Sequence, residues 1–322
     1  MSTHSKVAPR ISCVIPAYNE APNLKYVVEA TIEALSKLSP SFEVIVVNDG
    51  STDSSQAVMA SLLPLHPQLV FIDLSRNFGK EAAMTAGLEQ AQGDVIFQID
   101  ADGQHPLSLF PSMFEKWQTG IDVVYAVRNS REDQNALYVG LVAWFYRLIN
   151  WDGRFEIPRN AGDFRLMDRK VVDAILSLQE TNRFMKGLYA WVGFSSFAIG
   201  YDPLPRLEGK SHYGLMGGFK LALTGMLAFS TAPLRLLTGF GLFLAITAML
   251  YIFWIVFEHF YWGMTVPGYA TLIVSIVFFS GIQLLALGIL SAYIARIYEE
   301  VKQRPLYLIK QRMGQGLPTC TP

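Results

Sequence analysis

Asp100 and Asp102 are two carboxylates one residue apart, directly after the apolar run Val95–Ile99. Two carboxylates this close repel each other unless a cation lies between them. Hard oxygen ligands suit Mg²⁺ or Mn²⁺, and Mg²⁺ usually shares its coordination shell with substrate phosphates. Asp-x-Asp alone is common in surface turns, but its place at the end of an apolar strand, followed by Gly103 and Gln104, favours a metal–diphosphate site.

Three further polar clusters lie where runs of strand-forming residues end. They are Tyr18-Asn19-Glu20, Asn48-Asp49-Gly50-Ser51 and Ser75-Arg76-Asn77. Asn-Asp-Gly-Ser is ordinary turn chemistry, and Ser51 or Asp53 could cap the next helix. A carboxylate in this place can also accept a hydrogen bond from an N–H group of a nucleobase, so Asp49 is a candidate for nucleoside binding as well.

The elements that must position these clusters alternate between strand and helix. Strands are expected at Ile11–Ile15, Phe42–Val47, Leu69–Leu74, Val95–Ile99 and Asp122–Val127. Helices are expected between them at Ala21–Leu35, Ser54–Leu63, Lys80–Ala91 and Leu107–Trp117. This alternation predicts an α/β fold with a mainly parallel sheet covered on both faces, and ligands of such sheets bind beyond the carboxyl ends of the strands. The chain has no Gly-x-Gly-x-x-Gly after the first strand and no Walker sequence, which disfavours a Rossmann dehydrogenase or a P-loop ATPase.

The last third of the chain differs in composition from the rest. Only 16% of the 322 residues are charged, whereas an ordinary soluble domain has about 25%. Leu236–Phe257 contains no Asp, Glu, Lys or Arg, and a second uncharged run has its core at Tyr269–Ala295. Each run is longer than the roughly 20 residues that cross a bilayer, and the short connection His259–Gly268 predicts a hairpin. Buried core helices, the alternative, are usually shorter and carry a polar stripe.

Basic residues flank the hairpin on one side. Arg235 precedes the first run, the connection between the runs has no Lys or Arg, and the second run is followed by Arg296, Lys302, Arg304, Lys310 and Arg312. By the positive-inside rule, both termini and the N-terminal domain are expected in the cytoplasm. The polar start MSTHSKVAPR predicts no signal peptide.

Three smaller observations narrow the class of protein. Tyr213–Ser230 has apolar residues at helical spacing around Lys220, which predicts an amphipathic helix in the membrane interface; a core helix of the soluble part is the alternative. A net charge of −1 gives no general basic field for nucleic acid, and 51% hydrophobic residues exclude a disordered chain. Cys13 and Cys320 match no disulfide or metal spacing, as expected of a reducing cytosolic environment.

The motifs, taken in order, carry a family resemblance. Pro16-Ala17-Tyr18-Asn19-Glu20, Asn48-Asp49-Gly50-Ser51-Thr52-Asp53 and Asp100-Ala101-Asp102-Gly103-Gln104 resemble the motifs of the family 2 glycosyltransferases with the GT-A fold. Four more segments resemble the polyprenyl-phosphate glycosyltransferases within that family: 76–80, 161–166, 182–187 and Arg206-x-x-Gly209-x-Ser211-x-Tyr213. This subgroup includes dolichol-phosphate mannose synthase and the bactoprenol glucosyltransferases, and the chain most resembles the latter, which also carry a C-terminal pair of transmembrane helices. The resemblance covers nearly the whole chain.

The resemblance implies a role for each matching position. Nucleotide-sugar binding is implied for Pro16, Tyr18, Glu20, Asp49, Asp100, Ala101 and Asp102. A Mg²⁺ or Mn²⁺ ion on the diphosphate would be bound by Asp100, Asp102 and Gln104. Phosphate and acceptor groups would be met by Arg128, Arg206, Lys210 and Ser211. Asp163 takes the place of the family's catalytic base, with capping of the following segment as the alternative. His105 is not expected to act as a base; packing and a place beside the metal are its two alternatives.

The resemblance also implies a domain plan and a location. A cytoplasmic GT-A domain is expected at residues 1–212, an amphipathic interface helix at 213–232, and a cytoplasmic tail at 297–322. Two transmembrane helices, at about 234–257 and 269–295, are expected to make up the segment 233–296. The protein would then be a multi-pass protein of the bacterial inner membrane, with the lipid bilayer as a partner.

The activity implied is the inverting transfer of a sugar from a nucleotide-sugar donor to undecaprenyl or another polyprenyl phosphate. The product, a polyprenyl-monophosphate sugar, would serve the modification of cell-envelope glycans such as O-antigen. UDP-glucose is the expected donor; donors of mannose, N-acetylhexosamine or an aminoarabinose derivative are the alternatives. Because a phosphate monoester has a second pKa near 6, the acceptor is mostly ionised at neutral pH. Asp163 would therefore mainly orient the acceptor or take up a residual proton.

Other functions fit the sequence less well. A flippase or small channel usually has charged residues within its spans, and the two apolar runs have none. A non-catalytic scaffold with the same fold is disfavoured because Asp102 and Asp163 are both present. Processive polymerases of the family carry Gln-x-x-Arg-Trp, where Gln179–Phe184 has one additional residue and Phe in place of Trp. A homo-oligomer is compatible with the sequence but not required by it.

Overall fold

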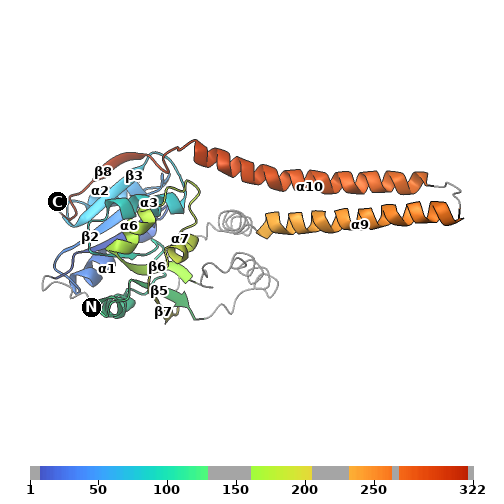
Figure 1. Cartoon of the computed structure of the whole chain (residues 1–322). Coiled ribbons are helices and arrows are strands. Elements are labelled where there is room, and N and C mark those ends of the chain that lie inside the picture. Colours follow the sequence, from blue (N-terminus) through green and yellow to red (C-terminus); the bar gives the residue numbers. More distant parts are fainter. Residues whose placement is uncertain (1–7, 130–160, 205–231, 263–267, 318–322) are drawn as a thin grey trace.

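The computed structural model describes residues 8–129, 161–204, 232–262 and 268–317. Within these residues the strands form one 8-stranded sheet in the order β7-β5-β6-β4-β1-β2-β3-β8 (Figure 1). The strands are β1 (Ile11–Ala17), β2 (Phe42–Asn48), β3 (Leu69–Leu74), β4 (Val95–Gln98), β5 (Val123–Arg128), β6 (Ala161–Asp168), β7 (Ser196–Tyr201) and β8 (Ile309–Met313). Neighbouring strands are parallel from β4 through β1 and β2 to β3, whereas β6 and β8 run antiparallel to their neighbours. The predicted α/β fold with a mainly parallel sheet is confirmed.

Helices cover both faces of this sheet. One face is covered by α1 (Ala21–Ser36), α2 (Ser55–Leu62) and, after the short 3-10 helix η1 (Leu107–Leu109), α4 (Phe110–Gln118). The other face is covered by α3 (Lys80–Gln90), α6 (Arg169–Ser177) and α7 (Met185–Trp191). The four helices expected between the first five strands are all present. Three lie within one residue of the expected bounds, and the fourth begins three residues late because Leu107–Leu109 forms η1.

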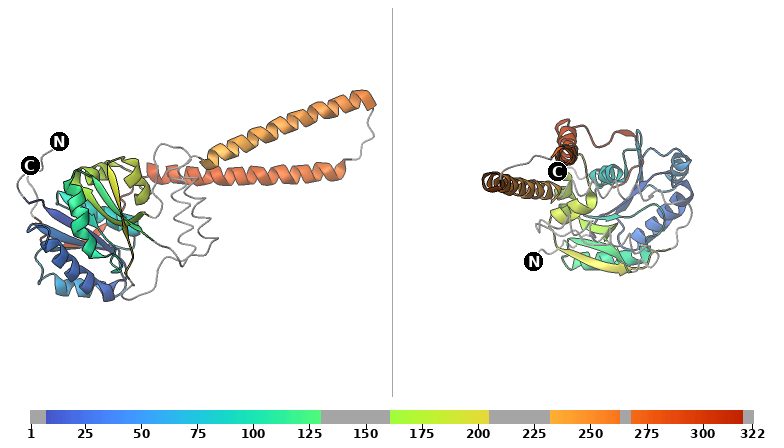
Figure 2. Two further views of the ribbon diagram at one scale, coloured as in Figure 1. Left: turned by 90° about the horizontal axis from the view of Figure 1, so that it is seen from below. Right: turned by 90° about the vertical axis from the view of Figure 1, so that its right-hand side faces the viewer.

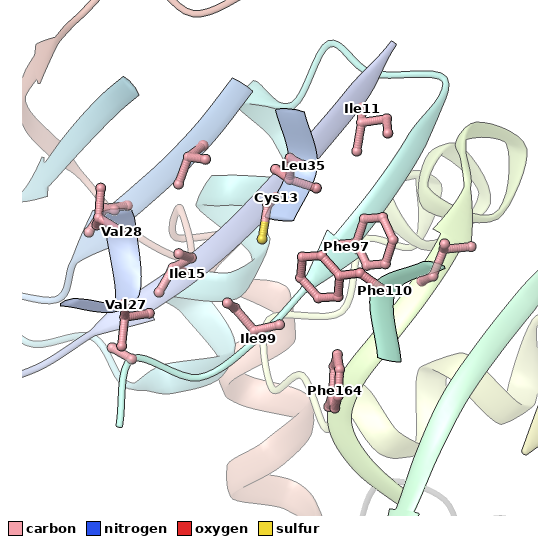
Figure 3. Packing of buried hydrophobic residues seen from close by; sticks show 14 of the residues in the cluster. Ile11, Cys13, Ile15, Val27, Val28, Leu35, Phe97, Ile99, Phe110 and Phe164 are labelled. Carbon is pink, nitrogen blue, oxygen red and sulfur yellow. The ribbon is translucent and has the colours of Figure 1, made fainter. Parts of the chain in front are cut away.

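The apolar core is divided by the sheet. Successive side chains of a strand point to opposite faces, so Cys13 and Ile15 of β1 pack with α1, while Val14 packs with α3. Figure 3 shows the α1 side, where Phe97 and Phe110 stack with their ring centroids 4.2 Å apart. Both faces of the central strands are therefore sealed from water, which leaves the strand ends as the places where polar groups gather.

The segment after the last helix returns to the sheet and forms β8, a strand that the sequence did not predict. It pairs antiparallel with β3, and Lys310 Nζ lies 3.3 Å from Asp73 Oδ2. Beyond it, the backbone N–H of Leu317 donates to Glu43 Oε2 at 2.9 Å. Glu43 is buried, and its Oε1 also accepts from Ser12 Oγ and the backbone N–H of Gln92, both at 2.7 Å. Residues 309–317 thus belong to the fold of the N-terminal domain.

Replacing Glu43 with glutamine is expected to loosen this segment and lower the melting temperature of the purified protein. The glutamine amide has only one acceptor oxygen, so its NH₂ group must face a buried donor, at a cost of about 1–3 kcal/mol. Glu33→Gln is the matched control, because Glu33 is exposed and pairs with Lys37 at the surface. A Glu43→Gln variant that melts with the Glu33→Gln control would show that the buried carboxylate does not hold the segment.

Two long helices project from the domain, as Figures 1 and 2 show. They are α9 (Ala232–Trp262) and α10 (Tyr269–Val301), each longer than the helix expected at its place. Large apolar side chains are exposed along both, among them Phe243, Phe253, Leu284 and Ile294. Among the described residues, Phe278–Val301 is the one helical stretch long and apolar enough to cross a membrane, and Leu237–Tyr251 is a shorter apolar stretch. The interface helix expected at 213–232 lies, except for its last residue, outside the described residues.

The end of α10 is fastened to the domain by hydrogen bonds. Glu300 accepts from the backbone N–H of Thr181, at 3.1 Å for Oε1 and 3.0 Å for Oε2, and from that of Asn182 at 3.3 Å. The side chain of Asn182 donates to Glu299 Oε2 at 2.7 Å. Residues 181–182 lie just before α7, so the long helix is joined to the layer of helices that also contains α3.

Candidate functional site

A cavity of about 520 Å³ lies at the carboxyl ends of β1, β2 and β4. We call it the strand-end cavity. It is lined by all seven residues expected to bind the nucleotide sugar, namely Pro16, Tyr18, Glu20, Asp49, Asp100, Ala101 and Asp102. Gln104 and Arg128 line it as well, together with Asn77, Gly79 and Lys80. The structure thus brings the polar clusters of separate strands into one place, as the parallel topology predicts.

The loops that follow β1 and β2 hold each other. Asn19 has a positive φ of 54°, a conformation that asparagine tolerates better than most residues. Its backbone N–H donates to Ser51 Oγ at 2.9 Å, and its side-chain oxygen accepts from the backbone N–H of Thr52 at 2.8 Å. Asp53 accepts from the backbone N–H of Ser55 at the start of α2, as expected, and from that of Ala21 at the start of α1, both at 3.0 Å. Tyr18 and Glu20 are thereby carried on a loop of fixed shape.

Asp49 has a structural task that the sequence did not reveal. Its side chain is 3% exposed, and its two oxygens accept from the backbone N–H groups of Phe78 at 2.7 Å and Gly79 at 2.9 Å. Burial raises the pKa of Asp49, and these two hydrogen bonds oppose the rise. The next residue, Gly50, lies so close to Arg76 that a Cβ atom would be 2.3 Å from its carbonyl carbon. Asp49 therefore fixes the segment that leads into α3.

The loop after β4 carries the paired carboxylates. The backbone N–H of Asp100 donates to Nδ1 of His105 at 3.1 Å, and that of Gln104 donates to Asp102 Oδ1 at 3.1 Å. His105 is 7% exposed and stacks on Phe164 at 4.8 Å between ring centroids. Burial lowers the pKa of His105, against the opposing charges of the two aspartates, so the ring is neutral at pH 7. The ring packs in the core and shapes the loop, and its Nε2 lies 3.9 Å from Asp100 Oδ2, so the structure is compatible with both expected alternatives.

The donor set of this loop fits a hard divalent cation. Asp100, Asp102 and Gln104, whose side chains carry carboxylate and amide oxygens, all line the strand-end cavity. Among the described residues there is no cluster of three or more His, Cys, Asp or Glu side chains with metal-ligand geometry. A site with two carboxylates suits Mg²⁺ or Mn²⁺, which complete their shells with water and substrate phosphates.

Asp163 lies on β6, and Lys80 joins it to the paired carboxylates. The Nζ atom of Lys80 is 2.6 Å from Asp163 Oδ2 and 2.6 Å from Asp100 Oδ1. Burial alone would raise the pKa of Asp163, but the charges of Lys80 and Lys186 outweigh it and hold the pKa well below its usual range. Burial likewise works to lower the pKa of Lys80, but Asp100 and Asp163 outweigh it, and the pKa rises. Asp163 is therefore ionised, and it does not cap a helix.

Lys80 is the site residue that the sequence reasoning missed. It belongs to the segment 76–80, whose resemblance to the family implies no role for the lysine. It is the first residue of α3, directly after the loop held by Asp49. A positive charge at the start of a helix interacts unfavourably with the helix dipole. A lysine at this position of the predicted helix therefore indicates that its side chain serves something other than the helix.

A group of buried polar side chains near Asp163 fixes the position of β6. Arg165 is 3% exposed, donates from Nη2 to the backbone carbonyl of Gly162 at 2.7 Å, and stacks on Tyr189 at 3.4 Å from its ring centroid. The hydroxyl of Tyr189 donates to Gln98 Oε1 at 2.7 Å. Glu81 accepts from the backbone N–H of Met185 at 3.2 Å. These contacts connect β6 with α3, α7 and β4, so the position of Asp163 is set by several elements at once.

Glu81 is expected to make stability depend on pH. Burial, and then the charge of Asp163, raise the pKa of Glu81 to about 8, from 4.5 in an exposed glutamate. Between these two values the folded protein binds more protons than the unfolded chain, so stability falls as pH rises through this window. Glu81→Gln keeps an acceptor for Met185 and removes the charge. The melting temperature of wild type should therefore fall, relative to that of Glu81→Gln, between pH 5 and pH 8. Glu29→Gln, at an exposed position of α1, is the control and should show the same pH dependence of the melting temperature as wild type. The same pH dependence in all three proteins would contradict the prediction.

The residues expected to meet phosphates are only partly described. Arg128, at the end of β5, lines the strand-end cavity, and its Nε donates to the hydroxyl of Tyr201 at 3.3 Å. Arg206, Lys210 and Ser211 lie outside the described residues. The expectation that they bind phosphate or acceptor groups stays a prediction.

The fold and the site define a class, and the sequence comparison gives the family. A mainly parallel α/β sheet with paired carboxylates at its strand ends is the architecture of a GT-A-like glycosyltransferase. The model of the family described as "Glycosyl transferase family 2" matches residues 12–176, and the chain belongs to this family.

Curated relatives match nearly the full length of the chain. A glycosyltransferase of Synechocystis sp. that is named as uncharacterized is 41% identical over 304 residues, which is 94% of this chain and 96% of the relative. The SfII prophage-derived bactoprenol glucosyl transferase of Shigella flexneri is 41% identical over 303 residues, 94% of this chain and 98% of the relative. Among solved structures, a mannosyltransferase of Pyrobaculum calidifontis in complex with GDP-Man and Mn²⁺ is 16% identical with a TM-score of 0.47, covering 94% of this chain and 86% of the other.

Proposed function

We propose that the protein transfers glucose from UDP-glucose to a polyprenyl phosphate at the cytoplasmic face of the bacterial inner membrane. The observation that carries this proposal is the 41% identity to bactoprenol glucosyl transferases over 94% of the chain, a range that includes both long helices. The arrangement of the strand-end cavity supports it. One carboxylate suited to a metal–diphosphate, Asp100, and the carboxylate suited to the acceptor, Asp163, both contact Lys80.

The donor binds in the strand-end cavity. Tyr18, Glu20 and Asp49 hold the nucleoside on the fixed loops after β1 and β2, although both oxygens of Asp49 already accept from the backbone. A carboxylate oxygen has more than one lone pair, so Asp49 can accept a further hydrogen bond. The diphosphate lies toward Asp100, Asp102 and Gln104, which would hold a Mg²⁺ or Mn²⁺ ion. When bound there, the ion neutralises the charge that develops on the leaving diphosphate.

The acceptor attacks from the opposite side of the sugar. A phosphate oxygen of the polyprenyl phosphate forms a bond to the anomeric carbon while the bond from that carbon to the diphosphate oxygen breaks, so the configuration inverts. The nucleoside diphosphate leaves with the electron pair. Because the acceptor phosphate is mostly ionised at neutral pH, and because Asp163 has a low pKa and is a weak base, the role of Asp163 is to orient the acceptor side of the site.

The long helices hold the enzyme at the membrane that contains its acceptor. We place α9 and α10 across the bilayer as a hairpin, supported by their length, their exposed apolar side chains and the basic residues near their domain ends. The hydrogen bonds between Glu300 and residues 181–182, and the pairing of β8 with β3, support one rigid unit. The domain plan is then a catalytic domain at 1–212, an interface helix at 213–232 and the two spans within 233–296, with residues 309–317 returning to the catalytic domain.

The test is transfer of radiolabelled sugar to lipid. The full-length protein, reconstituted in vesicles with undecaprenyl phosphate and Mg²⁺, is given UDP-glucose, GDP-mannose or UDP-N-acetylglucosamine. Label is expected in the lipid extract with UDP-glucose only, and not when EDTA is present. Transfer from another donor alone would correct the sugar, and no metal-dependent transfer to lipid from any nucleotide sugar would overturn the proposal.

A further inference from the structure

Lys80 contacts two carboxylates to which the proposed function gives different tasks. Its Nζ atom lies 2.6 Å from Asp100, a proposed metal ligand, and 2.6 Å from Asp163 on the acceptor side. Lysine has three N–H donors, and Lys80 also lines the strand-end cavity. After serving the two carboxylates, the ammonium group can still donate to an anion in that cavity.

The backbone holds this lysine in place before any substrate arrives. Asp49 accepts from the N–H groups of Phe78 and Gly79, which directly precede Lys80. Farther along α3, a Cβ atom on Gly87 would lie 2.3 Å from Cγ1 of Val14, so the glycine allows α3 to pack tightly against β1. The start of α3 is thus fixed against the central strands, and the side chain of Lys80 extends from a rigid base.

The charges around Lys80 explain what it does. Asp100, Asp102 and Asp163 bring three carboxylates to one region. Neighbouring like charges raise the free energy of the site unless a cation compensates them. Lys80 compensates part of this charge by direct contact with two of them. A divalent cation that binds Oδ1 of Asp100 competes with Lys80 for that oxygen, and the ammonium charge repels a cation anywhere on this carboxylate. The lysine therefore opposes metal binding until an anionic donor brings further negative charge.

We propose that Lys80 is a positioning residue that makes metal binding depend on the donor. Before a donor binds, its ammonium holds Asp100 and Asp163 together and weakens the affinity for a divalent cation. When the nucleotide diphosphate and its metal arrive, Lys80 yields Asp100 to the metal and stays on Asp163, with its freed N–H directed at the diphosphate. The inference rests on the proposed metal-dependent use of a nucleotide sugar. It adds that the divalent cation binds tightly only together with the donor.

The test is a titration of the purified full-length protein with Mn²⁺, followed by the EPR signal of the free ion, with and without UDP. For wild type, UDP is expected to tighten Mn²⁺ binding strongly. Lys80→Met should bind Mn²⁺ alone about tenfold more tightly than wild type, because the carboxylates are no longer compensated. UDP should then tighten its Mn²⁺ binding far less. Lys80→Arg, which keeps the charge, should behave more like wild type.

Two controls separate this role from simpler ones. Lys186→Met removes a charge that acts on Asp163 and Glu81, so a similar gain in Mn²⁺ affinity there would show that general charge, not the contact, is responsible. If Lys80→Met does not fold, Lys80→Gln, a neutral residue that can still form hydrogen bonds, is expected to show the same gain. Unchanged or weaker Mn²⁺ binding by the neutral variants would overturn the inference. Wild type that binds no Mn²⁺ even with UDP would instead contradict the proposed function.

Discussion

Replacing Asp163 with asparagine is expected to lower kcat by about 10²-fold, the cost of a misplaced acceptor, with little change in the KM for the nucleotide sugar. Asparagine keeps the shape of the side chain and one acceptor oxygen, but it removes the charge that pairs with Lys80 at 2.6 Å. The acceptor side of the site then loses its orientation while the donor side keeps its ligands. The measurement is steady-state transfer to polyprenyl phosphate in vesicles, with the two substrates varied separately.

The pH dependence tests how Asp163 acts. Because its pKa lies well below the usual range, the carboxylate stays ionised from pH 6 to pH 9. The low-pH limb of turnover should therefore come from the acceptor phosphate, whose second pKa is near 6, and it should have the same shape in Asp163→Asn and wild type. Asp173→Asn is the control, since Asp173 is exposed on α6 and pairs with Arg169 there. Near-normal turnover of Asp163→Asn would mean that the residue is dispensable.

The parallel part of the sheet could be predicted because its strands are buried on both faces. Such strands are continuous apolar runs, and the five expected strands correspond to β1 through β5 with small differences at their ends. The strand β8 has the opposite character, since the middle of Ile309–Met313 is Lys-Gln-Arg and the strand is exposed apart from a half-buried last residue. An edge strand of this kind is held mainly by backbone hydrogen bonds to β3, and no side-chain pattern reveals such bonds.

The strand β6 could not be predicted from the sequence for a different reason. Its side chains include Asp163 and Arg165, and Arg165 is buried against Tyr189 rather than exposed. A buried arginine in a strand breaks the alternation on which strand prediction depends. Asp163 could be named as a site residue only through the family resemblance, while its alternative as a helix cap was wrong. Asp168, at the end of the same strand, is the residue that caps α6, by accepting from the backbone N–H of Lys170 at 3.1 Å.

The candidate site could likewise be predicted only in part. The cluster at the strand ends was predictable because parallel topology alone brings those positions together. The residues predicted to bind the donor do line one cavity, while their binding role stays a prediction. The contacts of Lys80 were not predictable, because they require β6 to lie beside β4 and so join residues 83 positions apart in the chain. The same holds for Asp49, whose partners Phe78 and Gly79 are 29 and 30 positions away.

The second large effect is expected at the proposed metal site. Asp102→Asn is the informative change, because Asp100 also contacts Lys80 and its replacement would disturb the acceptor side as well. Asparagine can keep the hydrogen bond that Asp102 Oδ1 accepts from the backbone N–H of Gln104. The substitution therefore removes mainly a negative charge from the cavity. Turnover should fall by about 10²–10³-fold, because part of the charge stabilisation on the leaving diphosphate is lost.

The dependence on metal distinguishes this loss from a folding defect. Wild type should lose transfer in EDTA and regain it with Mg²⁺ or Mn²⁺, whereas Asp102→Asn should need at least about tenfold more metal for half-maximal activity, because a carboxylate is a far better ligand than an amide for these ions. Its melting temperature without metal should match wild type or exceed it, since one of three neighbouring negative charges has gone. If this variant needs no more metal than wild type for half-maximal activity, other groups bind the ion. The proposal that the loop after β4 binds the metal at the diphosphate would then be wrong.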